Sequence, residues 1–457
     1  MSPSLLFASN RLLIGGIAKL VLGSFATAGL GFAIHFSLSR SLEPASYGRL
    51  AAMLAVCSVL TPIASWCMPA MWIQVYGSEG WAARRWLSAS IWIMTAASLV
   101  TIVLLVGYVL ATEPWRGHWL IPISVAMIFI TLGQSFSEAV SIRLQLEERY
   151  ALLAAWQLFS PVGRVIVVIG AILMGSKSPW GVAGGFAVVA SVALAISLVT
   201  IEQLRRGHIR LAGHGAAPAV ISTGPPPALR QAFKESLPYV LLTIFYTVNT
   251  VGVVAIVERL LGPEDAAAYN VAFLTMNALY LTPTVIYMQF LKSKLFRWWN
   301  QDRQMFDAAF HVGVMTQLIL GLACMVVVVL AAPQIVHLLF GPRYEAAVLV
   351  LMILAGEIPI HFVLYTYATA FYSREHIFRK VTCNGIASVV CVVSNLVLTP
   401  AFGVKGAAIA TICTQVVLLL LYFLSARRHI DVCSTFRVKT VRRSVAYIAK
   451  YRAGAAV

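Results

Sequence analysis

Charged residues are scarce in this chain. Asp, Glu, Lys and Arg make up 11% of its 457 residues, whereas they make up about 25% of an ordinary soluble domain. Apolar residues reach 60% and the mean hydropathy is +0.84. One soluble core cannot bury so much apolar surface, because such cores stop growing at about 250–300 residues. The composition therefore excludes a soluble protein and predicts helices covered by lipid.

Cysteine pairs and catalytic motifs are also missing. The seven cysteines are an odd number and show no metal-ligand spacing. All except Cys433 fall in apolar runs, where reduced cysteine acts as a small apolar residue. The sequence has no glycine-rich nucleotide loop, no G-x-S-x-G and no H-E-x-x-H. We therefore expect no cofactor, no metal and no enzymatic activity, ATP hydrolysis included.

Long apolar runs, in contrast, fill most of the chain. A helix needs about 20 mainly apolar residues to cross the hydrocarbon core of a membrane, and twelve runs meet this requirement. They are residues 13–38, 49–74, 87–111, 119–140, 152–174, 181–202, 237–260, 267–290, 311–340, 346–371, 381–400 and 404–425. The sequence therefore predicts an all-α polytopic membrane protein with about twelve transmembrane helices.

The net charge of +17 comes from 34 Lys and Arg residues set against 17 acidic ones. Most of these basic residues fall in the loops and termini on one side of the twelve spans. The positive-inside rule places that side, with both termini, in the cytoplasm. The basic residues are spread between apolar runs and along the C-terminal tail, so we expect them to contact anionic lipids, and we expect no nucleic-acid partner.

The spans divide into two halves. Residues 1–202 and 236–425 are each predicted to form a six-helix lobe. They are joined by a cytoplasmic linker at 203–235 and followed by a basic cytoplasmic tail at 426–457. The halves share features at similar offsets, because Pro44 and Pro263 are 219 residues apart and Gly181 and Gly403 are 222 residues apart. Two halves of like topology predict a transporter with a central cavity between its lobes.

Ionisable residues inside the spans of the first half are candidates for the substrate site, because such groups are costly at membrane depth. Arg164 lies about halfway along its predicted span and could hold a phosphate group bidentately; a structural pairing with a carboxylate or a helix carbonyl is the alternative. Glu138 could line the cavity or pair with Lys19, which is predicted at a comparable depth.

Polar residues in the second half suggest a second role. Glu357 and His361 are four residues apart and so share one helix face, where they could carry a proton or a cation during transport. A polar contact between helices is the alternative. Tyr246 and Asn249 form a polar patch halfway along the seventh span, and they either line the cavity or hold helices together.

Four short segments carry a resemblance to a known family. Leu42–Gly48 (LEPASYG) resembles the LGPxxYG signature of the polysaccharide-transporter family, and Leu261–Asp265 (LGPED) is similar to its second-half echo. Leu339–Ala347 (LFGPRYEAA) resembles the family's LFGxxY loop, and Thr399–Thr411 (TPAFGVKGAAIAT) resembles its glycine-rich ending. The family comprises Wzx-like O-antigen and exopolysaccharide flippases of the multidrug/oligosaccharidyl-lipid/polysaccharide (MOP) superfamily.

The resemblance implies a two-lobed, MATE-like fold in the bacterial inner membrane. It also implies a flippase that moves an oligosaccharide linked to undecaprenyl pyrophosphate to the periplasmic leaflet by alternating access. Polysaccharide polymerase and export machinery are the implied protein partners. Three alternatives remain: a cation-coupled exporter of small molecules from the same superfamily, a membrane glycan polymerase or ligase, and a non-transporting scaffold.

Overall fold

The computed structural model describes residues 3–112, 120–176, 178–211, 214, 225–284, 298, 302–370, 377–427, 443–444 and 446–447. Regular structure within these ranges is helical, without any strand. The chain divides into two compact units, Met1–Thr247 and Val248–Val457, which we call lobe 1 and lobe 2. The expectation of an all-α protein in two lobes is confirmed.

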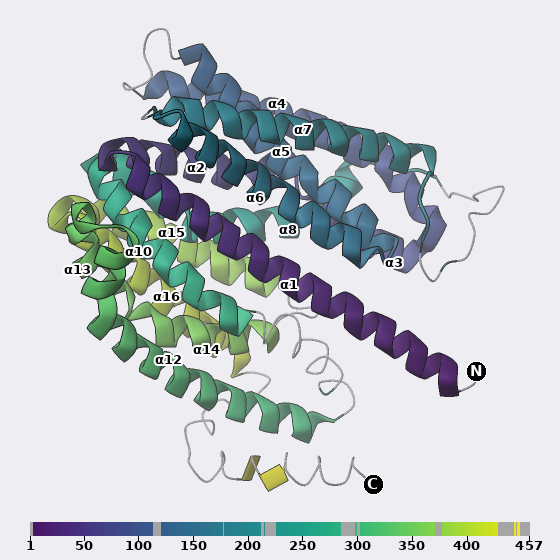
Figure 1. The fold of residues 1–457 in the computed structure, drawn as a ribbon. Helices are drawn as coiled ribbons and strands as arrows, with labels where there is room; N and C mark the ends of the chain where they lie inside the picture. Colours follow the sequence, from purple (N-terminus) through teal and green to yellow (C-terminus); the bar gives the residue numbers. More distant parts are fainter. Residues whose placement is uncertain are drawn as a thin grey trace. The chain divides into compact units, whose positions relative to one another are not determined.

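Lobe 1 is built from long helices that run side by side (Figure 1). The α-helices are α1 (Pro3–Ser41), α2 (Pro44–Ala64), α3 (Met68–Glu79), α4 (Arg85–Ala111), α5 (Leu120–Leu146), α6 (Tyr150–Leu173), α7 (Pro179–Arg206) and most of α8 (Leu229–Asn249). A 3-10 turn, η1 (Gly80–Arg84), connects α3 to α4.

Lobe 2 contains the other helices that the structure describes. They are α9 (Gly252–Leu261), α10 (Pro263–Thr284), α12 (Arg303–Leu339), the 3-10 turn η4 (Pro342–Tyr344), α13 (Glu345–Leu354), α14 (Glu357–Ala370), α15 (Ile377–Phe402) and α16 (Val404–Ala426). Its buried core includes Phe310, Tyr367 and Tyr422, where α12, α14 and α16 meet.

Every predicted span overlaps a helix or a pair of helices. Among the described residues, eight helices are long and apolar enough to cross a membrane, or ten if each of two bent pairs forms one span. The stretch Pro44–Ala111 counts once in that total although it contains two of the predicted spans. The predicted span 267–290 overlaps α10, which is described to Thr284. Apolar side chains such as Val103 and Leu173 are 70% and 81% exposed, as expected where lipid is the solvent.

Close backbone contact joins α5 to α7 in lobe 1. A Cβ atom added to Gly133 of α5 would lie 2.3 Å from the carbonyl oxygen of Ala190 in α7. Small residues at helix interfaces allow this approach in membranes, where packing contacts drive the association of helices. The lobe 1 core is completed by Trp72, Trp86 and Leu204, which are buried among α3, α4 and α7.

The two prolines of the predicted repeat have equivalent places in the structure. Pro44 is the first residue of α2 and Pro263 is the first residue of α10. Proline suits the first turn of a helix because its missing N–H has no partner there in any case. Gly262, which precedes the second proline, has a φ of 111°, a value that glycine tolerates without a steric penalty.

The boundary between the lobes falls after Thr247, within the seventh predicted span, whereas the sequence places the second half from residue 236. Most of α8 joins lobe 1, where Phe233 stacks on Trp66 with ring centroids 4.7 Å apart. Much of the linker 203–235 and most of the tail 426–457 lie outside the described residues, so the predicted limits stay a prediction.

Candidate functional site

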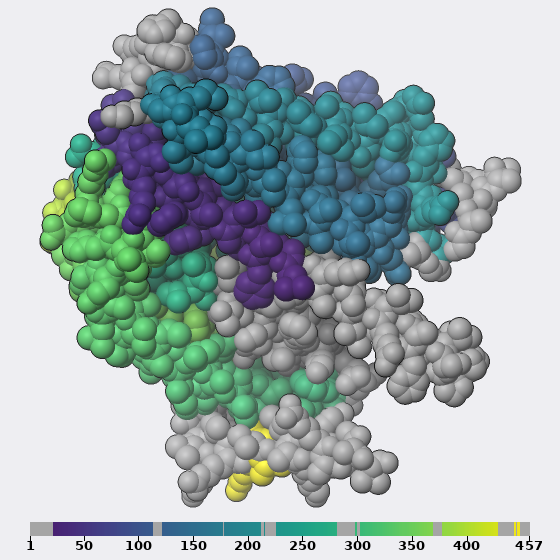
Figure 2. All heavy atoms as spheres, in the orientation of Figure 1, coloured from purple at the N-terminus to yellow at the C-terminus, as the bar shows by residue number. Residues whose placement is uncertain are grey.

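A polar stripe runs along one face of α6 in lobe 1. Gln157, Ser160 and Arg164 follow one another at spacings of three and four residues, which places them on the same face of the helix. Helix α1 packs along α6, and Figure 2 shows the two side by side at the surface of lobe 1. Thr27 of α1 donates a hydrogen bond to the backbone oxygen of Gln157 at 3.4 Å.

A pocket of about 390 Å³ opens on this stripe. Trp156 forms part of its wall, stacked on Phe159 with centroids 5.4 Å apart, and donates its ring N–H to the backbone oxygen of Ser137. The side-chain oxygen of Gln157 is buried without a hydrogen-bond partner among the described residues. The lining residues are Ser24, Thr27, Ala28, Ser137, Ser141, Trp156, Gln157, Phe159, Ser160 and Ala193. The pocket is uncharged, rich in hydroxyl groups and flanked by two aromatic rings.

Arg164 lies two helical turns beyond Gln157. Its guanidinium carbon is 5.1 Å from the centroid of the Phe186 ring. Its Nε and Nη2 atoms are buried and have no hydrogen-bond partner in the described part of the chain. It is within electrostatic range of His35 in α1 and Cys57 in α2. Arg164 makes no ion pair with a carboxylate among the described residues, and its binding role and its structural role both stay predictions.

Glu138 is exposed on α5, within electrostatic range of Cys67. Lys19 lies in α1, but its side chain is outside the described residues. The pairing of Glu138 with Lys19 therefore stays a prediction.

Tyr246 and Asn249 end helix α8 and differ in environment. The side chain of Tyr246 is 56% exposed, whereas Asn249 is buried and its Oδ1 atom has no hydrogen-bond partner in the described structure. Residues 250–251 then interrupt the helix before α9 begins at Gly252. Their predicted role in the cavity stays a prediction.

Glu357 and His361 are buried in contact with each other in lobe 2. The Nδ1 atom of His361 is 3.4 Å from a carboxylate oxygen of Glu357, and both side chains are at most 10% exposed. The His361 ring stacks on Tyr280 at a centroid distance of 4.0 Å, and its Nε2 atom lies 3.3 Å from the Tyr365 hydroxyl. The side chains expected to share a face are therefore in contact.

The pair sits where a helix is broken. Pro342–Leu354 and Glu357–Ala368 are bent by 49° relative to each other, and Glu357 is the first residue after the break. Broken helices of transporters carry substrate and ion sites, because unwound backbone groups become available there. The described residues contain no cluster of three or more metal-ligating side chains.

Two features of the site were not anticipated from the sequence. The hydroxyl-lined pocket combines serines of α1, α5 and α6, and serine is common at helix contacts in membranes, so nothing marks these residues individually. The spacing of Gln157, Ser160 and Arg164 on one face was a usable signal. The break after Leu354 was also missed, although Gly356 and Pro359 flank Glu357.

The model of the polysaccharide biosynthesis protein family matches residues 13–290, which is more than half of the chain. The chain belongs to this family. No curated protein matches it. Membership of the polysaccharide biosynthesis family confirms the family resemblance expected from the four short motifs. The eight to ten apolar spans among the described residues agree with a multi-pass membrane protein.

Three of the solved structures that share the fold of this chain are the following. The lipid II flippase MurJ in an inward closed conformation aligns with a TM-score of 0.65 and 13% identity, over 93% of this chain and 90% of MurJ. An inward-facing multidrug resistance MATE transporter aligns with a TM-score of 0.59 and 11% identity, over 90% and 96% of the two chains. A MOP superfamily transporter from Pyrococcus furiosus aligns with a TM-score of 0.57 and 12% identity, over 93% and 96%. These likenesses confirm the MATE-like fold of this family member.

Proposed function

We propose that this protein flips a lipid-linked oligosaccharide of the undecaprenyl-pyrophosphate type across the bacterial inner membrane for polysaccharide export. Membership of the polysaccharide biosynthesis family supports this substrate class, and the fold is similar to that of a lipid II flippase. Both termini would be cytoplasmic, and the two lobes would expose the headgroup to each side of the membrane in turn. The polymerase and export machinery would receive the product.

One observation carries the proposal: two buried guanidinium nitrogens of Arg164 lack hydrogen-bond partners among the described residues, and Arg164 shares a helix face with the hydroxyl-lined pocket. Leaving buried donors without partners costs free energy, and a diphosphate offers the bidentate acceptors that a guanidinium fits. The seven residue steps from Gln157 to Arg164 correspond to a rise of about 10 Å along a helix. That length suits a headgroup whose diphosphate binds Arg164 while a sugar occupies the pocket.

The other candidate residues have defined places in this proposal. Glu138, Lys19, Tyr246 and Asn249 would line the path of the sugar headgroup. The buried pair of Glu357 and His361 would couple the movement to a proton or a cation, because protonation of either partner changes the charge beside a helix break.

The test is to replace Arg164 with Ala in a strain that depends on this protein for surface glycan. We expect surface glycan to be lost and lipid-linked oligosaccharide to accumulate on the cytoplasmic leaflet, with protein abundance near normal. The exposed Arg49 at the start of α2 supplies the control variant Arg49→Ala, which should export normally. Normal export by Arg164→Ala would remove this residue from the mechanism, and unchanged glycan in a deletion strain would refute the function.

A second function is favoured by the buried contact between Glu357 and His361 in lobe 2. A cation-coupled exporter of small molecules would use a buried carboxylate such as Glu357 as its ion switch, and the fold is also similar to that of a multidrug transporter. Overexpression would then confer resistance to cationic compounds, and deletion would leave surface glycan unchanged.

A further inference from the structure

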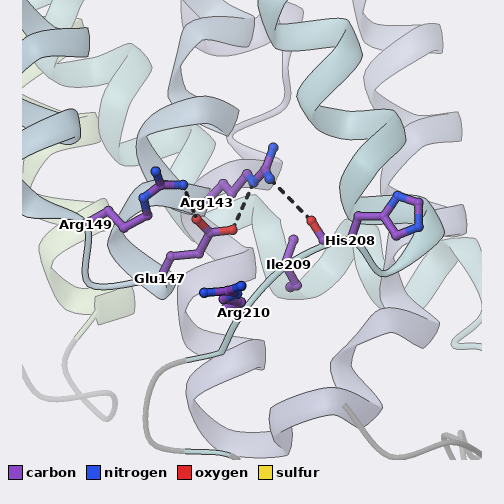
Figure 3. Close-up of a pocket in the computed structure, with 6 residues that line it drawn as sticks. All are labelled: Arg143, Glu147, Arg149, His208, Ile209 and Arg210. Carbon is purple, nitrogen blue, oxygen red and sulfur yellow. Dashed lines mark hydrogen bonds and ion pairs between the residues drawn. The ribbon is translucent and has the colours of Figure 1, made fainter. Parts of the chain in front are cut away.

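A second cavity lies at one end of lobe 1, away from the Arg164 stripe. Its volume is about 680 Å³. It is formed where α5 ends, where the turn 147–149 leads into α6, and where the chain leaves α7 at 208–210 (Figure 3). The lining residues are Arg143, Glu147, Arg149, His208, Ile209 and Arg210.

Glu147 organises two of the three arginines. Its carboxylate is only 5% exposed, and its oxygens accept from Arg143 Nε at 3.1 Å and from Arg149 Nη1 at 3.3 Å. Arg143 also donates to the side chain of Gln203 and, at 3.3 Å, to the backbone oxygen of His208. Arg143 is therefore held in place by α5, α7 and the segment after α7.

Arg210 is not part of this network. Figure 3 shows Arg143 and Arg149 directed at Glu147, whereas no interaction with the drawn residues is marked for Arg210. In the described part of the chain Arg210 is exposed and has neither an ion pair nor a hydrogen bond. Its charge is therefore available to a ligand in the cavity.

The cavity has an excess of positive charge. Three arginines face a single carboxylate, so these four side chains together leave about two positive charges. The helix dipoles add partial charges to the cavity: about −0.5 elementary charge from each of the C-terminal ends of α5 and α7, and about +0.5 from the N-terminal end of α6. The arginines therefore do more than offset the helix dipoles, since about 1.5 positive charges remain.

We propose that this cavity binds the phosphate group of a membrane lipid headgroup. Guanidinium groups arranged around one cavity match the geometry and charge of phosphate oxygens. The volume exceeds that of a phosphate alone and accommodates the rest of a headgroup. The positive-inside rule assigns this end of lobe 1 to the cytoplasm, where two lipids offer the same chemistry: an anionic phospholipid, and the diphosphate of the proposed glycan carrier. The phosphate site itself does not depend on the proposed flippase function; only the second source does.

The experiment measures lipid binding to the purified full-length protein in nanodiscs. Phosphatidylcholine nanodiscs receive either phosphatidylglycerol or undecaprenyl pyrophosphate, and bound lipid is quantified by native mass spectrometry for the wild type, Arg210→Gln and Arg149→Gln. Both arginine side chains are exposed, so the variants should fold. The matched control is Arg205→Gln, at the same end of lobe 1, whose side chain is 62% exposed and already paired with Glu202.

We expect the pocket variants to bind the anionic lipid about tenfold more weakly, because each loses a charge-assisted contact, while the control binds like the wild type. Weakening confined to phosphatidylglycerol identifies a phospholipid headgroup, and weakening confined to undecaprenyl pyrophosphate identifies the glycan carrier. Equal binding of both lipids by wild type, pocket variants and control would overturn the proposal. Because export by the Arg164 variants is measured separately, failure here is distinguishable from failure of the proposed function.

Discussion

Replacing Arg164 with Met should stabilise lobe 1 while it abolishes export. The guanidinium has two buried nitrogens without partners in the described structure, and each such donor costs about 1–3 kcal/mol. Methionine has a similar length and no donors. It loses the contact with the Phe186 ring, which contributes about 0.5–2 kcal/mol. With each contribution at the middle of its range, about 4 kcal/mol for the two donors less about 1 kcal/mol for the ring contact, the free energy of unfolding rises by about 3 kcal/mol.

Thermal unfolding of the purified protein in detergent measures this gain. A unit of 150–250 residues shifts its midpoint by about 2–4 °C per kcal/mol, so the Met variant should unfold several degrees above the wild type. Arg164→Lys is the matched control: it keeps the charge, loses the bidentate geometry, and should gain little stability while it exports poorly. A Met variant that unfolds below the wild type yet still exports glycan would refute the reasoning, because Arg164 would then be a structural residue.

Two further predictions concern lobe 2 and the packing of lobe 1. Glu357→Gln removes the buried carboxylate beside His361, so transport into proteoliposomes should no longer respond to an imposed pH gradient. The control is Glu345→Gln, at an exposed position in the same bent pair of helices, and its transport should respond normally. An equal response in both variants would contradict the coupling role of Glu357. Gly133→Ala places a Cβ atom 2.3 Å from the Ala190 carbonyl oxygen and should lower the free energy of unfolding by about 1–3 kcal/mol. The control is Gly107→Ala, whose added Cβ has no atom within 4 Å and which should unfold at the same temperature as the wild type. Equal stability of the two variants would contradict the prediction, because α5 and α7 would then move apart without any loss in the free energy of unfolding.

Several elements were predictable because they depend on local sequence. The apolar runs predicted the helices, since a backbone in lipid must satisfy its own hydrogen bonds. The prolines at Pro44 and Pro263 mark helix starts for the same local reason. The four-residue spacing of Glu357 and His361 was enough to predict that they share a helix face. In the structure the Nδ1 atom of His361 is 3.4 Å from a carboxylate oxygen of Glu357.

Properties that depend on several helices were not predictable in this way. The sequence left open whether Arg164 has a carboxylate partner, because that depends on which side chains α1, α2 and α7 bring to α6. The hydroxyl-lined pocket draws on residues from Ser24 to Ala193, and the basic cavity joins Arg143 to Arg210. Their individual side chains are ordinary in a membrane protein, and only their convergence forms a site.

The sequence by itself determined that this protein is helical and membrane-embedded, because the length and apolarity of each run are properties of consecutive residues. Its motifs also determined the family. The tertiary structure alone decided which polar groups are left without partners and where cavities form around them. Whether a polar group finds a hydrogen-bond partner, and whether a cavity is enclosed, depends on residues that are far apart in the chain. The close packing of helices at positions such as Gly133 brings those residues together.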